Sequence, residues 1–228
     1  MKKVVVISLG GSLIIPDKID IGFLRHFKKV IRKNLHKYSF VIVCGGGSIA
    51  RKYISALNEI GVSEKLQNYA GISATRTNAR FMSYLFNQDP ERGIPQKIKQ
   101  VKSYLRNQNV VFCGGLEYKP NQTSDSSAAA IARNFGTTFI NITNVKGLYD
   151  KNPKEFKNAK FIPRISWEEF YKMASKLNYK PGQHFALDQT AARMILNNKT
   201  LTYIIGKDLK QLNNLLNNKE FIGTRIEG

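Results

Sequence analysis

Four short apolar runs, each ending in glycines or small polar residues, are the feature that most restricts how this chain can fold. The runs cover residues 4–9, 40–44, 110–113 and 137–143, and their ends are marked by Gly10-Gly11-Ser12, Gly45-Gly46-Gly47, Gly114-Gly115 and Thr143-Asn144. Apolar and polar side chains do not alternate within the runs, so we expect strands that are buried on both faces. Helical patterns separate the runs, which is typical of a parallel sheet. The sequence therefore predicts an α/β fold with a mainly parallel central sheet sandwiched between helices.

The helices are predicted from apolar residues spaced three and four positions apart. They cover residues 19–35, 49–57, 63–86 (as one or two helices), 97–106, 125–135, 187–196 and 209–216. A further helix is predicted to begin at Ser166, where Glu169 completes a capping box. Residues 150–164 are predicted to be rich in loops, and residues 221–226 to form a last strand.

The segment 40–51, FVIVCGGGSIAR, indicates what such a glycine turn can bind. Ser48 has the chemistry of a helix N-cap, and Arg51 lies one turn into the predicted helix. Glycines let the backbone approach an anion closely, and a helix N-terminus carries partial positive charge. The guanidinium of Arg51 adds donors for the same oxygens. The segment is therefore a candidate phosphate site, although three glycines also suit a plain tight turn between a strand and a helix.

All four turns are expected at one edge of the sheet, because the carboxyl ends of parallel strands lie at the same edge. Open α/β sheets bind their ligands at this edge. Several glycine and small polar turns together are suited to a long ligand with several charges. We therefore expect the binding site here.

The 228 residues are expected to form one domain. The formal net charge of +20 favours polyanionic ligands, but the lysines are scattered, which indicates a solvated basic surface rather than a face that binds nucleic acid. No apolar run approaches the roughly 18 residues of a membrane helix, and the N-terminal segment lacks signal-peptide features. We therefore expect a cytoplasmic protein with no membrane partner. Cys44 and Cys113 have no metal-ligand spacing and are predicted to be buried, reduced thiols.

Ordered motifs along nearly the whole chain resemble those of the amino acid kinase family and, within it, of the archaeal-type UMP kinases. The motifs are VVVISLGGS, FVIVCGGGSIARKYI, GISATRTNA, TSDSSAAAIA, ITNVKGLYDKNP, LDQTAARMI and GTRIEG. GISATRTNA is the most discriminating, because it resembles the UMP kinase branch rather than the branches that phosphorylate amino acids. The resemblance implies transfer of the γ-phosphoryl group of ATP, with Mg²⁺, to UMP, which gives UDP and ADP in pyrimidine nucleotide biosynthesis.

The resemblance also implies where the two nucleotides bind. ATP is placed at Gly11, Ser12, Gly47, Arg51, Thr143, Asn144, Tyr149 and Asn152. UMP is placed at Gly46, Asn68, Gly114, Gly115, Thr123 and Ser124, partly in a loop that covers residues 116–124. Asp125 would organise the reacting groups, with Arg51 and Lys207 as the other catalytic residues, and no protein side chain is assigned to the metal. Residues 1–136 would form mainly the acceptor lobe and residues 137–228 mainly the ATP lobe.

The first departure from the family pattern is Ser8, which stands where many members carry a lysine two residues before the first glycine pair. Another cation must then balance the charge of the phosphates. Lys207, in the segment IIGKD at a predicted strand end, is the candidate.

Three further departures remove carboxylates from the implied nucleotide sites. Lys146 and Asn152 stand where the ATP-binding turns usually carry aspartate, with Asp150 close enough in sequence to replace the second one. Asn68 stands where an acid is expected on the UMP ribose, and its neutral amide can still hydrogen-bond a hydroxyl.

These departures leave two alternatives open. The chain could be an enzyme of this fold that phosphorylates another small phosphate acceptor, or a non-catalytic protein that binds a nucleotide or an oxyanion. The family also suggests a homo-oligomer, a hexamer built from dimers. The apolar face of residues 21–35 would serve that assembly unless it is ordinary core.

Overall fold

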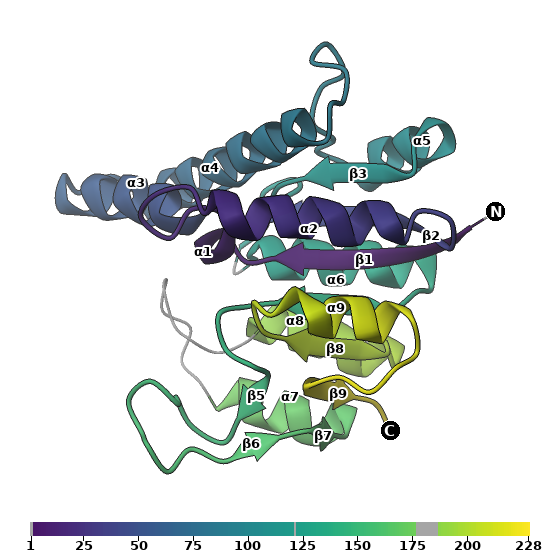
Figure 1. Cartoon of the computed structure of the whole chain (residues 1–228). Coiled ribbons are helices and arrows are strands. Elements are labelled where there is room, and N and C mark those ends of the chain that lie inside the picture. The colour runs from purple at the N-terminus through teal and green to yellow at the C-terminus, as the bar shows by residue number, and fades with distance from the viewer. Residues whose placement is uncertain (1, 121, 177–186) are drawn as a thin grey trace.

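A computed structural model of the chain describes residues 2–120, 122–176 and 187–228 (Figure 1). The main sheet has seven strands in the order β3-β2-β1-β4-β8-β9-β7. Their bounds are β1 (Lys3–Leu9), β2 (Tyr38–Cys44), β3 (Val110–Cys113), β4 (Phe139–Ile142), β7 (Arg164–Ile165), β8 (Thr202–Ile205) and β9 (Gly223–Ile226). The strands from β3 to β8 in this order pair in parallel, and β9 runs antiparallel to β8. The predicted mainly parallel sheet is therefore confirmed.

The order of the strands explains where a ligand can enter. The chain builds β1, β2 and β3 outward in one direction and then returns to place β4 on the other side of β1. At such a reversal, the loops that follow two neighbouring strands diverge and leave a crevice at the carboxyl edge of the sheet. By this rule the crevice is expected between the ends of β1 and β4.

Helices cover both faces of the sheet, as predicted (Figure 1). One hydrophobic core takes residues from α1 (Gly11–Ile14), α2 (Ile21–Lys33), α4 (Glu64–Leu85) and α9 (Leu209–Leu216). The other takes residues from α5 (Ile98–Asn107), α6 (Ser124–Phe135), α7 (Trp167–Ser175) and α8 (Gln189–Asn198). The helix α3 (Gly47–Glu59) lies beside α4 and extends past the sheet in Figure 1. The strand β1 supplies both cores, since Ile7 belongs to one and Val6 to the other.

The apolar face of α2 is ordinary core. Leu24, Phe27 and Ile31 are buried against the sheet of the same chain, and basic residues occupy the outer face. Ile21, at the start of the helix, is 65 % exposed. The stripe that the sequence offers for packing against a second copy is therefore already used within the chain.

The structure contains short elements that periodicity does not predict. Residues 11–14 form the helix α1 instead of continuing the glycine turn, because Leu13 and Ile14 turn inward and are buried. The loop-rich segment that follows β4 holds a two-stranded hairpin, β5 (Leu148–Tyr149) and β6 (Phe161–Ile162). Elements of two to four residues are too short to show a helical or strand period.

The two cysteines are free and buried, as predicted. Cys44 belongs to one hydrophobic core and Cys113 to the other, so their side chains lie on opposite faces of the sheet. Burial raises the pKa of Cys113 to about 12. Neither cysteine therefore offers a thiolate for chemistry at neutral pH.

A single sheet runs through both predicted lobes, because β1 of the first is paired with β4 of the second. The division at residue 136 stays a prediction. None of the described helices combines the length and the apolar character that crossing a membrane requires.

Candidate active site

The glycine turns after β1 and β2 are in direct contact. A Cβ atom on Gly11 would lie 2.0 Å from the backbone nitrogen of Gly47 and 2.6 Å from the carbonyl carbon of Gly45, so no side chain fits there. The Gly45 amide donates to the carbonyl of Leu9 at 2.9 Å. Gly47 has a φ of 62°, a conformation that glycine adopts without steric cost. The glycines are thus what allows the two strand ends to meet.

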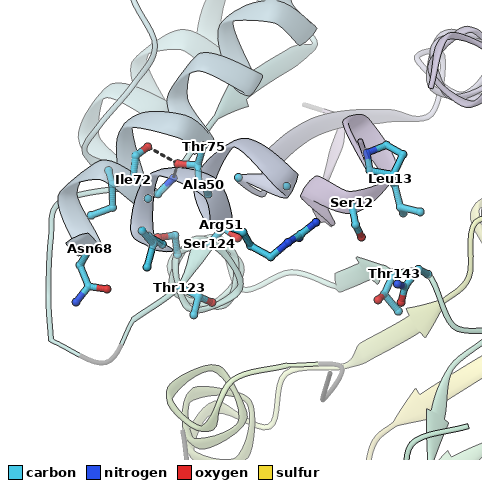
Figure 2. A pocket seen from close by; sticks show the side chains of 18 of the residues that line it. Ser12, Leu13, Ala50, Arg51, Asn68, Ile72, Thr75, Thr123, Ser124 and Thr143 are labelled. Atoms are coloured by element: carbon cyan, nitrogen blue, oxygen red, sulfur yellow. Dashed lines mark hydrogen bonds between the residues drawn. The ribbon is translucent and has the colours of Figure 1, made fainter. Parts of the chain in front are cut away.

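A cleft of about 870 Å³ opens beside these turns (Figure 2). Most of the residues predicted to bind or act on the nucleotides line it, namely Ser12, Gly46, Gly47, Arg51, Asn68, Gly115, Thr123, Ser124, Thr143, Asn144, Asn152 and Lys207. These side chains and backbones come from segments far apart in the sequence. The fold therefore collects the predicted acceptor residues and the predicted ATP residues around one space. Residue 121, in the implied UMP loop, lies outside the described residues.

The other four predicted residues, Gly11, Gly114, Asp125 and Tyr149, do not line the cleft. Gly11 makes the contact between the turns. Gly114 lies against α4, where a Cβ atom would be 2.5 Å from Oγ1 of Thr75. Tyr149 packs against Phe161 across the hairpin, with ring centroids 5.5 Å apart. At these positions the structure shows close packing, and their roles toward nucleotides stay predictions.

The N-terminus of α3 opens onto the cleft without a side-chain cap. Its N-cap is Gly46, which has no side chain to accept from the first amides of the helix, and of these amides that of Ser48 donates to the carbonyl of Ile15 at 3.2 Å. Open helix N-termini attract anions, because their amide groups and the helix dipole both favour negative charge. Arg51 lies one turn later and extends toward Ser12 in Figure 2. Backbone amides and a guanidinium therefore converge where the sequence predicts a phosphate.

The N-terminus of α6, by contrast, is already closed by side chains. Oγ1 of Thr123 accepts from the amide of Asp125 at 3.0 Å. Oδ2 of Asp188 accepts from the amide of Ser126 at 3.1 Å, and Oδ1 of the same residue caps α8 through the amide of Ala191 at 2.8 Å. A phosphate is thus expected at α3 rather than at α6.

Asp125 and Asp188 form an acidic pair that hydroxyl groups surround. Ser8 donates from Oγ to Oδ1 of Asp125 at 2.5 Å. The hydroxyls of Thr123 and Ser126 donate to Asp188, each at 2.6 Å. Burial and, to a smaller extent, the charge of Asp188 raise the pKa of Asp125 to about 7, while the hydrogen bond from Ser8 lowers it. Asp125 therefore changes its protonation near neutral pH.

Sequence reasoning did not single out Asp188 as part of the site. It falls inside the helix predicted over residues 187–196, and in the structure it is the N-cap of α8. Its second role depends on α6 and α8 starting side by side, although Ser126 and Asp188 are 62 positions apart. Only the fold could reveal that one carboxylate caps both helices.

Both signs of charge line the cleft. The cations are Arg51, Lys119, Lys154 and Lys207, and the carboxylates are Asp17, Asp20, Glu64 and Glu117. Asp20 is engaged by the amide of Phe23 at 3.0 Å, and Glu117 by Lys97 at 3.0 Å. Within the described part of the chain, none of the four cations is in an ion pair. Their charge is therefore available to a polyanion.

Asp150, the suggested replacement for the aspartate that is absent at Asn152, is engaged in the hairpin of β5 and β6. Oδ1 of Asp150 accepts from the amide of Lys160 at 2.7 Å and closes the hairpin, outside the cleft. Asn152 does line the cleft, and its side chain accepts from the amide of Lys154 at 3.1 Å. Asp150 therefore lies outside the cleft that Asn152 lines, and its role as a replacement stays a prediction.

A magnesium ion that arrives with its nucleotide does not need a preformed cage of protein side chains. No three histidine, cysteine or carboxylate side chains gather into a metal cage in residues 2–120, 122–176 and 187–228. Mg²⁺ keeps several waters and is usually held by one or two carboxylates together with substrate phosphates. A site without a dedicated cage is compatible with that mode of binding.

Comparisons with known proteins agree over the whole chain. The model of the amino acid kinase family matches residues 3–206. The uridylate kinase of Thermoplasma volcanium is 33 % identical over 228 residues, which cover 100 % of this chain and 99 % of that protein. The uridylate kinase of Thermoplasma acidophilum is 34 % identical over 230 residues, which cover 100 % and 98 %. The crystal structure of uridylate kinase from Archaeoglobus fulgidus matches with a TM-score of 0.83 at 30 % identity, covering 99 % of this chain and 100 % of that one.

Proposed function

The chain belongs to the amino acid kinase family, and we propose that it is a UMP kinase, which transfers the γ-phosphoryl group of ATP to UMP and forms UDP and ADP. The observation that carries this proposal is the contact between Gly11 and Gly47. This contact brings the predicted ATP residues and the predicted acceptor residues to a single cleft, as a direct transfer between two nucleotides requires.

ATP is expected in the crevice between β1 and β4. Ser12, Gly47, Thr143, Asn144, Asn152 and Lys207 line the cleft on that side. UMP is expected on the side formed by Gly46, Asn68, Gly115, Thr123 and Ser124. In Figure 2, Arg51 lies between Asn68 and Thr143, which belong to opposite sides. Arg51 is therefore the residue best placed to contact the phosphate that is transferred.

Phosphoryl transfer needs little covalent help from a protein, because alignment and stabilisation of charge supply most of the catalysis. The amides of Gly47 and Ile49 at the start of α3 and the guanidinium of Arg51 would bind the oxygens of the transferred group. Lys207 would neutralise charge from the ATP side. Mg²⁺ bound to the ATP phosphates would supply further positive charge. Asp125 would hold the start of α6 in register with the end of β1 through its bond with Ser8.

The decisive experiment is an acceptor panel. The purified protein is incubated with ATP, Mg²⁺ and one of UMP, CMP or dUMP, and the diphosphate products are separated and quantified. We expect UDP as the main product. Asp125→Ala removes the acceptor for the Ser8 hydroxyl and should lower kcat about 100-fold, the scale at which misalignment slows a bound reaction, whereas Asp125→Asn keeps an acceptor oxygen and tests the charge of the carboxylate. Turnover of another acceptor without UDP formation would reject the proposal.

The neutral residue at Asn68 gives the first alternative, an enzyme of the same fold with another small phosphate acceptor, a specific basis. The same panel detects it. Tight binding of ATP without transfer to any acceptor would favour the second alternative, a non-catalytic protein that binds a nucleotide or an oxyanion. Both binding and transfer are measured on the same preparation.

We further propose a cytoplasmic homo-oligomer, in keeping with the hexamer that the family suggests. Because the apolar face of α2 is buried, the contacts would use other exposed apolar side chains. Those on α3 and α4 are Tyr53, Leu66, Tyr69 and Tyr84. The mass measured by light scattering, for the native chain and for Tyr53→Ser, tests the assembly.

A further inference from the structure

Two consecutive side chains of α4, Thr75 and Arg76, hold the backbone that follows β3. Oγ1 of Thr75 accepts from the amide of Gly115 at 2.7 Å. Arg76 donates from Nε to the carbonyl of Gly115 at 3.1 Å and from Nη2 to the carbonyl of Leu116 at 2.9 Å. The amide of Leu116 donates to Oγ of Ser127 at 3.2 Å. All four backbone polar groups of Gly115 and Leu116 are therefore satisfied within the protein.

Helix α4 approaches this backbone as closely as atoms allow. A Cβ atom on Gly114 would lie 2.5 Å from Oγ1 of Thr75 and 2.6 Å from the backbone nitrogen of Arg76. The Thr75 hydroxyl donates to the carbonyl of Ile72 at 2.6 Å, a bond drawn in Figure 2, which turns its lone pairs toward Gly115. The close approach at Gly114 and the orientation of the Thr75 hydroxyl together fix how α4 packs against the turn that follows β3.

Arg76 is an unusual residue to find in such a place. Its side chain is partly buried, and within the described part of the chain it is in no ion pair. It does not line the cleft, whereas Thr75, Gly115 and Leu116 do. A planar guanidinium can bridge two neighbouring acceptors in a fixed arrangement, which an ammonium cannot do. The guanidinium of Arg76 thus holds the Gly115–Leu116 backbone, which lines the cleft, from the side that faces away from the cleft.

We propose that Arg76 is a positioning residue for the acceptor nucleotide, because it fixes the Gly115–Leu116 wall of the side that receives UMP. The inference rests on the proposed function, which assigns this side to UMP. Since the amides of Gly115 and Leu116 are occupied, hydrogen-bond donors to the base have to come from elsewhere on this side. The side chains of Asn68 and Gln122 line the cleft there.

The same helix supplies a matched control. Arg80 lies one turn after Arg76 and also donates to two carbonyls, those of Pro90 at 2.8 Å and Arg92 at 3.2 Å. These carbonyls belong to a loop that does not line the cleft. Arg80→Met therefore removes a similar set of bonds from the same helix without touching the acceptor side.

The kinetic test compares Arg76→Met, Arg76→Lys and Arg80→Met with the native chain. For Arg76→Met we expect the KM for UMP to rise about tenfold, the size expected for loss of a charged hydrogen bond, with the KM for ATP unchanged. Arg76→Lys restores the charge but not the bridge, so its KM for UMP should stay raised. Arg80→Met should match the native chain in both KM values.

Three results would overturn the inference: a native KM for UMP in Arg76→Met, equal rises in both KM values, or full rescue by Arg76→Lys. If the native chain forms no UDP, the proposed function fails instead, and hydrogen exchange on the free protein still tests the wall. We expect the amides of Gly115 and Leu116 to exchange faster in Arg76→Met and Arg76→Lys but not in Arg80→Met. Unchanged exchange would overturn the inference independently of activity.

Discussion

Ser8, at the end of β1, donates a hydrogen bond to Asp125 in the first turn of α6, with 2.5 Å between Oγ and Oδ1. Ser8 is 1 % exposed and occupies the position at which many members of the family carry a lysine. A lysine would place a positive charge beside the carboxyl group, whereas the serine supplies only a hydrogen bond. Burial therefore dominates and raises the pKa of Asp125. In the proposed function, the positive charge for the phosphates would come from cleft residues such as Arg51 and Lys207.

The raised pKa of Asp125 predicts a pH-dependent stability. The folded pKa of about 7 lies above the ordinary value near 4, so the folded state binds a proton that the unfolded state has lost between these pH values. Raising the pH through this window therefore destabilises the native chain. Asp125→Asn cannot titrate, and from pH 5 to pH 8 it should gain about 2–3 kcal/mol relative to the native chain.

Urea unfolding of both proteins at several pH values checks this. The comparison removes the contribution of the other titrating groups, which the two proteins share. A constant difference in unfolding free energy between pH 5 and pH 8 would show that Asp125 is ionised throughout.

Replacing Arg51 should reduce kcat/KM much more than replacing Lys52, its neighbour on the same helix. Both side chains are exposed, but Arg51 lines the cleft and Lys52 does not. Because Arg51 is placed to meet charge that develops in the transition state, Arg51→Met should lower kcat/KM by about 100-fold or more. Lys52→Met removes the same charge from the surface and should leave the rate within about twofold. Steady-state kinetics with saturating ATP measures both, and equal losses would point to a general effect of net charge.

The convergence of the glycine turns could be predicted from the sequence, because apolar runs define the strands and glycines mark their ends. A parallel sheet then brings those ends to one edge. The short helix α1 could not be predicted, since four residues carry no period.

The contacts between elements were also beyond the sequence. That Gly114 touches α4 and that Asp188 caps two helices depends on which helix packs over which strand. Neither contact can be predicted from the identity of the residues alone. The departure at Ser8 was visible in the sequence, but its bond with Asp125 was not, because the two residues are 117 positions apart.

A substitution at Asn68 is expected to strengthen the binding of UMP. Asn68 lines the cleft (Figure 2), and the resemblance to UMP kinases implies an acid on the UMP ribose at this position. Asn68→Asp would turn a neutral hydrogen bond to a hydroxyl into a charged one, so the KM for UMP should fall about fivefold with the KM for ATP unchanged. Asn58→Asp adds the same charge on α3 outside the cleft and serves as the control. An unchanged or higher KM for UMP would mean that Asn68 does not face the ribose.

Disrupting the contact between Gly11 and Gly47 is expected to cause the largest loss of stability among these variants. In Gly11→Ala the new methyl group would lie 2.0 Å from the nitrogen of Gly47, so one of the two turns has to move. We expect a loss of stability of about 3 kcal/mol or more and, in any folded fraction, a weaker affinity for ATP. Gly22→Ala is the control, because its methyl group would meet only Oδ1 of Asp20 at 3.6 Å, and alanine favours a helix by up to about 1 kcal/mol. Urea unfolding and ATP titration measure both variants. A Gly11→Ala protein that is as stable as the native chain and binds ATP equally well would mean that the two turns are not held in contact, and the single shared cleft would lose its basis.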